Sequence, residues 1–167
     1  MARGYFRMTF DRLFYQAAAG AAAAGLAALL AASPAAAATD RCDDLAKQLK
    51  NQIDGMRIGQ TAAGTIYLAH PRAREITLGC SGKNFSNQLF AKADRKPTPA
   101  FVDLIASASA IIFTLPKADM QRGASRCIRR MGFLHGDDVS IRYRRLDIRC
   151  VRTKTESTIT ISRSKDQ

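Results

Sequence analysis

The apolar positions of this chain change their spacing along its length, and the spacing predicts helices and strands in turn. After residue 38, apolar side chains recur every three or four residues, which places them on one face of a helix. These side chains are Cys42, Leu45, Leu49, Ile53 and Met56. Thr39 or Asp40 is the expected cap, and Gly55 and Gly59 are expected to end the helix.

A two-residue alternation follows this helix and predicts strands. The first strand is expected around residues 65–69, followed by a turn at His70-Pro71. The second covers residues 75–80, and a third short strand is expected near 88–93. Alternation in the second strand places three side chains on one face, namely Ile76, Leu78 and Cys80.

The second half of the chain repeats this order. A helix is predicted near residues 119–131, followed by strands over 139–143, 145–150 and 157–162. The inward positions of these three strands are Val139, Ile141 and Tyr143, then Leu146, Ile148 and Cys150, then Ile159 and Ile161. Because apolar positions change phase at Arg144-Arg145, a tight turn or a bulge is expected there.

Cysteine placement indicates how the two halves are related. Each half has an Arg-Cys pair in its helix, at 41–42 and 126–127, and a strand that ends in cysteine. An internal α-β-β-β duplication explains this pattern, and so does chance, because the halves share little identity. Four cysteines allow three pairings. If each cysteine strand packs on its own helix, the bridges are Cys42–Cys80 and Cys127–Cys150.

Residues 98–115 separate the halves and predict a third helix. Thr98 is the expected N-cap, Pro99 suits the first helical position, and Pro116 stops the run. Asp103 is its one charge, so the helix is expected to be the buried core of the domain. A membrane segment and a partner-binding helix are the alternatives, and the run is short for a membrane span. The predicted fold is α+β: an antiparallel sheet packed against helices, with two α-β-β-β units around a buried central helix if the duplication is real.

The N-terminus has the pattern of a secretory signal. Basic residues are followed by an apolar run over 17–32, a break at Ser33-Pro34, and small residues at Ala36 and Ala38. We expect residues 1–38 to be a cleavable signal peptide and residues 39–167 to form one globular domain in the bacterial periplasm or the medium. The alternative is an uncleaved anchor, for which the apolar run is short of the ~20 residues that span a bilayer.

The cysteine content and the net charge of the chain add two further predictions. All four cysteines lie beyond residue 38, and an even number in an oxidising compartment predicts two disulfides. Zinc is disfavoured because the chain has no C-x-x-C pair. Removing the three arginines and one aspartate of the leader lowers the net charge from +12 to +10. Such a charge favours anionic partners.

Catalytic and cofactor motifs give no prediction of an enzyme. The two histidines, His70 and His135, lie in predicted turns, and His135 with Asp137 and Asp138 is better explained as a turn than as a metal site. We therefore expect no cofactor, no metal and no catalytic residue. A small envelope hydrolase with an unrecognised site and an inhibitor of an extracytoplasmic enzyme are the alternatives. A pocket that joins a histidine to an acid and a hydroxyl would favour the enzyme.

The segment from Arg122 to Lys154 is unusually basic, with ten basic side chains against three acids. Nine of the ten are arginines, which bind carboxylate, phosphate or sulfate through paired hydrogen bonds. The strand phase is expected to bring several of them to one solvent face. The candidate anion-binding residues are Arg129, Arg130, Arg142, Arg144, Arg145 and Arg149.

The compartment narrows the identity of an anionic partner. An envelope polysaccharide, a lipid head group or an acidic protein is expected, and nucleic acid is disfavoured because an exported protein does not meet it in the envelope. The alternative is an ordinary solvated sheet face, made rich in arginine by a GC-rich coding bias. The predicted function is that of an exported, non-enzymatic binding or accessory protein.

Overall fold

The computed structural model of the chain describes residues 34–80, 87–132 and 134–163, which all belong to one compact unit. The predicted leader up to residue 33 lies outside the described residues. Ala38, after which the sequence predicts cleavage, lies in the first helix. The described residues form three helices and seven strands, in the order α1 (Pro34–Gln52), β1 (Arg57–Ala62), β2 (Thr65–Ala69), β3 (Glu75–Gly79), β4 (Gln88–Asp94), α2 (Pro99–Phe113), α3 (Lys117–Arg130), β5 (Asp138–Tyr143), β6 (Leu146–Arg152) and β7 (Glu156–Arg163).

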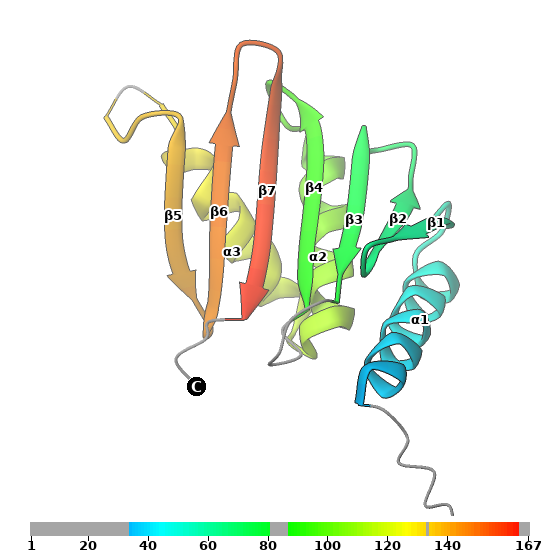
Figure 1. Ribbon diagram of the computed structural model, residues 1–167. Coiled ribbons are helices and arrows are strands. Elements are labelled where there is room, and N and C mark those ends of the chain that lie inside the picture. Colours follow the sequence, from blue (N-terminus) through cyan, green and yellow to red (C-terminus); the bar gives the residue numbers. More distant parts are fainter. Residues whose placement is uncertain (1–33, 81–86, 133, 164–167) are drawn as a thin grey trace, which may run out of the picture. The chain divides into compact units, whose positions relative to one another are not determined.

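The strands form one antiparallel sheet in the order β1-β2-β3-β4-β7-β6-β5 (Figure 1). Two three-stranded meanders, β2-β3-β4 and β7-β6-β5, meet where β4 pairs with β7. Each meander follows a helix that carries a cysteine, and the second cysteine of each half lies in or directly after the middle strand. The fold is α+β, as predicted. The second half has the expected α-β-β-β order, whereas in the first half four strands follow the helix, because β1 precedes the three predicted strands.

One face of the sheet is covered by helices. In Figure 1, α2 and α3 lie behind the strands, and α1 contacts β1, β2 and α2. Alternate strand residues point into this layer and are almost fully buried, among them Leu78, Leu89, Ile148 and Ile161. No helix of the described chain covers the opposite face, which we call the open sheet face. The two-residue alternation in the sequence therefore arises because one face of the sheet is covered by helices and the other is not.

Helix α2 is the central core helix that the sequence predicts. The Thr98 side chain accepts a hydrogen bond from the Phe101 N–H at 3.1 Å, and Pro99 occupies the first helical turn. Eight of the helix's fifteen residues are buried, and it contacts β4 and both other helices. Among the described residues, no helix is long and apolar enough to cross a membrane.

One helix boundary and one strand differ from the predictions. Helix α1 begins at Pro34 and runs through the expected caps at Thr39 and Asp40. Alanine is the strongest helix former and proline is favoured at the first helical position, so Pro34 and the alanines after it extend the helix. Strand β1 was not predicted, because all six of its residues are exposed and give no alternation. Its backbone pairs with β2 at the sheet edge.

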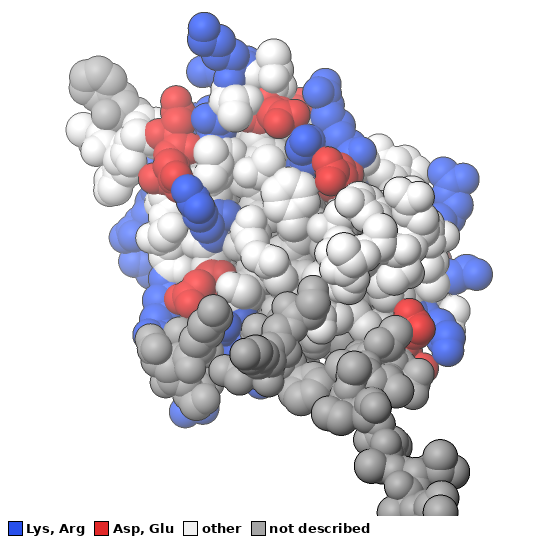
Figure 2. All heavy atoms as spheres, viewed as in Figure 1, with Lys and Arg blue, Asp and Glu red and all other residues white. Residues whose placement is uncertain are grey.

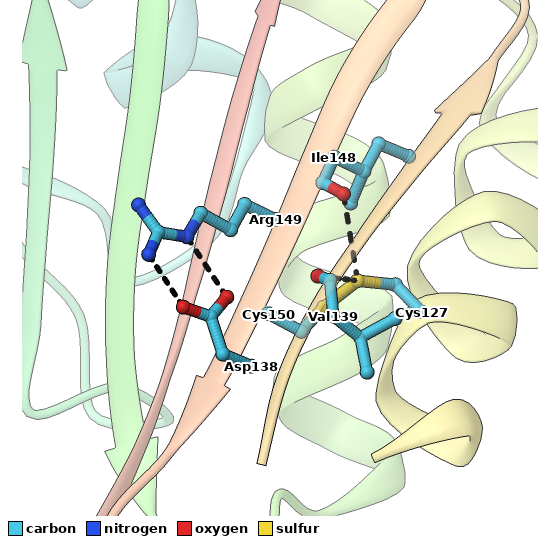
Figure 3. Close-up of a disulfide and its surroundings, with 6 residues drawn as sticks. All are labelled: Cys127, Asp138, Val139, Ile148, Arg149 and Cys150. Atoms are coloured by element: carbon cyan, nitrogen blue, oxygen red, sulfur yellow. Dashed lines mark hydrogen bonds and ion pairs between the residues drawn. A yellow bond between two sulfur atoms is a disulfide. The ribbon is translucent and has the colours of Figure 1, made fainter. Parts of the chain in front are cut away.

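Both bridges that the duplication predicts are present. Cys42 is joined to Cys80 and Cys127 to Cys150, with Cα atoms 5.9 and 6.0 Å apart. Each bridge fastens a helix to the sheet within its own half. The Cys127 sulfur also lies 3.7 Å from the carbonyl oxygens of both Val139 and Ile148, so it is seated between β5 and β6 (Figure 3).

Candidate anion-binding surface

The structure distributes the six candidate arginines over three places. Arg142 and Arg149 lie on the open sheet face, and Arg129 and Arg130 are exposed in the last turn of α3. Arg144 and Arg145 form the turn between β5 and β6. Ten residue steps, or about 15 Å along the helix axis, separate Arg129 from Asp119, the α3 residue that Arg144 contacts. The sequence therefore identified exposed cations that do not form a single cluster.

The turn at Arg144-Arg145 explains why no common face forms. Both residues have positive φ, at 51° and 63°, and Tyr143 pairs with Leu146 across the turn. The expected tight turn is confirmed, but the expected shared face is wrong for these two arginines. The Arg144 Nε lies 3.4 Å from a carboxylate oxygen of Asp119, so this side chain reaches α3 and the helical layer.

Charges on the open sheet face are compensated. The Arg149 guanidinium donates two hydrogen bonds to the Asp138 carboxylate, at 2.9 and 2.5 Å (Figure 3). These hydrogen bonds, together with the charge of Arg149, hold the pKa of Asp138 below its usual value. Arg142 stands opposite Asp147 in the β5–β6 register. This face therefore offers an anion little uncompensated positive charge.

Uncharged side chains make up most of the centre of the open sheet face, where Arg149 is the one charged member of the central row. The register aligns one row of side chains across six strands, namely Ser140, Arg149, Thr160, Phe90, Thr77 and Tyr67. Figure 2 views this side and shows white groups at the centre with blue and red groups around them. Lys92, beside the row, lies between Glu75 at 3.2 Å and Glu156 at 3.6 Å.

Helix α3 carries three exposed arginines without an ion pair in the described residues, next to Arg122, which pairs with Asp119. Four exposed side chains follow one another at helical spacing, and we call them the α3 arginine stripe: Arg122, Arg126, Arg129 and Arg130. Hydrogen bonds with Tyr143 and Asp119 raise the pKa of Arg122. Within the described part of the chain, the other three have no ion pair. The four arginines stand at i, i+4, i+7 and i+8, a helical spacing that is visible in the sequence. Arg122 and Arg126 were nevertheless not among the candidate residues.

A second location tests the enzyme alternative. A cavity of about 180 Å³ joins His70 to Asp103 and Ser107, the combination that would favour a hydrolase. The His70 Nδ1 accepts the Arg72 N–H at 3.1 Å, and its Nε2 lies 3.0 Å from the Asp54 carbonyl oxygen. A general base needs a ring nitrogen within reach of the substrate proton. Both ring nitrogens are engaged, so this histidine is placed for a structural role.

The other groups of this cavity are also engaged. The Asp103 carboxylate lies 2.8 Å from the Lys117 Nζ, and the Ser107 hydroxyl donates to the Asp103 carbonyl oxygen at 3.0 Å. His135, the second histidine, is exposed. Among the residues that the structure describes, no three His, Cys, Asp or Glu side chains converge as metal ligands would. The described histidine, carboxylate and hydroxyl of this cavity each have a partner within the protein.

Comparison with protein-family models, with curated proteins and with solved structures finds no match to this chain. Any functional assignment therefore rests on the residues of the chain itself. Among the described residues, the α3 arginine stripe brings together three exposed arginines that have no ion pair, namely Arg126, Arg129 and Arg130.

Proposed function

We propose that this chain is an exported, non-enzymatic binding protein whose α3 arginine stripe binds an anionic polysaccharide of the cell envelope. The observation that carries the proposal is the row of exposed arginines on α3, three of which have no carboxylate partner in the described residues. Guanidinium groups form paired hydrogen bonds with carboxylate and sulfate. The eight residues from Arg122 to Arg129 extend over about 10 Å of helix, which suits a linear chain of anionic groups.

The stripe opposes the stability of its own helix. Like charges at i, i+4 destabilise a helix by about 0.2–0.5 kcal/mol per pair, and Arg126 forms such pairs with Arg122 and Arg130. Arg129 and Arg130 are compensated in part, because cations in the last turn interact favourably with the helix dipole. Arg126 lacks that benefit and is the most informative position. A bound polyanion would relieve the repulsion along the whole stripe.

The export part of the proposal rests on two features. The N-terminal sequence has the pattern of a signal peptide, and the two disulfides fit an oxidising compartment. Expression of the full chain followed by N-terminal sequencing of the periplasmic fraction tests it. A mature N-terminus at Thr39 is expected, and retention of the full chain in the cytoplasm would contradict export.

Retention on immobilised heparin tests the stripe. The variant Arg122→Gln/Arg126→Gln/Arg129→Gln is expected to elute at clearly lower salt than the parent, because these ionic contacts depend on salt. The matched control Lys50→Gln/Arg57→Gln/Lys154→Gln removes the same charge from exposed positions elsewhere. The control is expected to elute close to the parent. Equal shifts for the two variants would show that only net charge matters and would contradict the proposal.

A third variant compares the stripe with the originally predicted residues. Arg142→Gln/Arg145→Gln/Arg149→Gln removes three charges from the open sheet face and the hairpin turn. If this variant loses more heparin retention than the stripe variant, the anion site lies there instead. Vesicles with and without phosphatidylglycerol form a separate arm. Binding to anionic vesicles without binding to heparin would replace the polysaccharide with a lipid head group as the partner.

A further inference from the structure

A second group of cations surrounds a small cavity far from α3 in the sequence. The cavity has a volume of about 130 Å³ and lies between the turn after β2 and the loop that leads from β4 into α2. Arg72 and Arg74 line it from the first segment, and Lys96 lines it from the second. Phe101, only 2% exposed, contributes to the apolar part of the lining. The cavity thus combines cationic groups with an apolar floor.

Hydrogen bonds to His70 hold the first wall of this cavity in place. His70 is 8% exposed, and its Nδ1 accepts the Arg72 N–H at 3.1 Å. The His70 carbonyl oxygen accepts the Ala73 N–H at 3.1 Å, and its Nε2 lies 3.0 Å from the Asp54 carbonyl oxygen. The Arg74 N–H donates to β4 through the Lys92 carbonyl oxygen at 2.9 Å. The backbone that carries both arginines is therefore preorganised.

The second wall is anchored on both sides of Lys96. The Ser157 hydroxyl donates to the Arg95 carbonyl oxygen at 2.7 Å, which ties the loop to β7. Thr98 caps α2 through the Phe101 N–H. Because both walls are held by hydrogen bonds, a ligand that enters does not have to order a flexible loop. Preorganisation of this kind lowers the free-energy cost of binding.

The charge balance of the cavity favours an anion. The one carboxylate in its lining, Asp94, pairs with Arg74 at 2.6 Å. Arg72 and Lys96 have no carboxylate partner among the described residues. The neighbouring cavity beside His70 is also lined by Arg72, but it contains the Asp103 carboxylate, which repels anions. An anion is therefore expected in the smaller cavity. We propose that this smaller cavity binds a tetrahedral oxyanion, the phosphate or sulfate group of a small ligand.

Size and chemistry agree with this ligand. A dry protein cavity of about 150 Å³ admits benzene, which has six heavy atoms, so one of about 130 Å³ has room for the five heavy atoms of phosphate or sulfate. Arginine offers paired donors to such oxyanions, and lysine adds a compact charge. Arg72 and Lys96 line the cavity from its two walls, so both can contact a group bound between them.

An NMR titration with inorganic phosphate, and separately with sulfate, tests the pocket. Protein purified after expression of the full chain is titrated at constant ionic strength, with chloride as the balancing anion. Saturable amide shifts are expected in residues 71–74 and 95–98 with at least one of the two anions. The anion that binds more tightly identifies the natural group. Shifts that rise linearly without saturation for both anions would overturn the proposal.

A double variant and a matched control locate the binding. Arg72→Gln/Lys96→Gln is expected to weaken phosphate or sulfate binding at least tenfold. Lys50→Gln/Lys154→Gln removes the same charge elsewhere and is expected to stay within twofold of the parent. All four side chains are exposed, so the variants are expected to fold, which dispersed spectra will verify. Saturable binding that survives in the double variant would overturn the proposal.

The proposals for the pocket and for the α3 arginine stripe can be refuted independently of each other. The variant Arg122→Gln/Arg126→Gln/Arg129→Gln is expected to keep phosphate or sulfate binding within twofold of the parent. The variant Arg72→Gln/Lys96→Gln is expected to elute from heparin together with its matched control. Loss of small-anion binding in the stripe variant would place that anion on α3 and contradict the pocket.

Discussion

The β5–β6 hairpin turn allows a direct test of how the structure holds its arginines. Arg144 and Arg145 occupy the two central positions, both with positive φ. A two-residue turn of this kind favours Asn-Gly, because asparagine and glycine tolerate the left-handed region. We expect the double substitution Arg144→Asn/Arg145→Gly to raise the free energy of unfolding.

The magnitude follows from three contributions. A left-handed conformation costs an ordinary residue about 1–2 kcal/mol, so two such residues hold about 2–4 kcal/mol of strain. Glycine offsets about 0.5–1 kcal/mol of the gain, because it gives the unfolded chain more conformational entropy. The ion pair of Arg144 with the largely buried Asp119 is also lost, at a cost of about 1 kcal/mol, because Asp119 keeps its pair with Arg122. A net stabilisation of about 1–2 kcal/mol is expected.

Urea unfolding measures this change. With an m-value of about 2 kcal/mol per molar, the midpoint is expected to rise by about 0.5–1 M at unchanged m. The control Arg144→Gln/Arg145→Gln removes both charges but keeps side chains that disfavour positive φ, so no gain is expected from it. The reasoning is refuted if the Asn-Gly variant is no more stable than the Gln-Gln control.

Three further predictions concern other parts of the fold. On titration with dithiothreitol, the α1–β3 bridge is expected to be reduced before the fully buried α3–β6 bridge, because Cys80 is only partly buried; alkylation and mass spectrometry would show the order. His70→Ala leaves a carbonyl oxygen and an N–H unpaired and is expected to destabilise the fold by about 2–3 kcal/mol in urea unfolding. The lowered pKa of Asp138 means that its ion pair stabilises the fold above the usual carboxylate pKa and loses this effect as the pH falls through the lowered value. NMR titration of Arg149→Gln is expected to show the pKa of Asp138 rising towards its usual value.

Local patterns predicted most elements of this fold because each pattern has a local physical cause. Buried side chains at Ile76 and Leu78 alternate with more exposed neighbours, so the strand is visible in the sequence. Thr98 and Pro99 mark the start of α2 because a cap and a first-turn proline act within one helical turn. The bridges were predictable because each joins a helix and a strand of the same half.

Features that depend on long-range pairing were not predictable. Pairing of β4 with β7, which merges the halves into one sheet, leaves no local signal in either strand. Strand alternation separates the two faces, but it does not show that Arg149 would meet Asp138 across the sheet. The path of Arg144 towards Asp119 depends on how α3 packs against the hairpin. The sequence therefore shows which arginines are exposed, but not how they are grouped or paired in the fold.

The disulfide and the anion-binding proposal are connected through α3. Cys127 directly follows Arg126, and its bridge to Cys150 ties the helix to β6. Gly123 brings the same helix close to the sheet, since a Cβ at this position would lie 3.0 Å from side-chain atoms of Ile148 and Tyr143. The helix that presents the arginine stripe is thus held by a covalent bond and by close packing, and a rigid array of cations loses little entropy when it binds a polyanion. Because disulfides form and persist mainly in oxidising compartments, export would complete the surface on which the proposed binding depends.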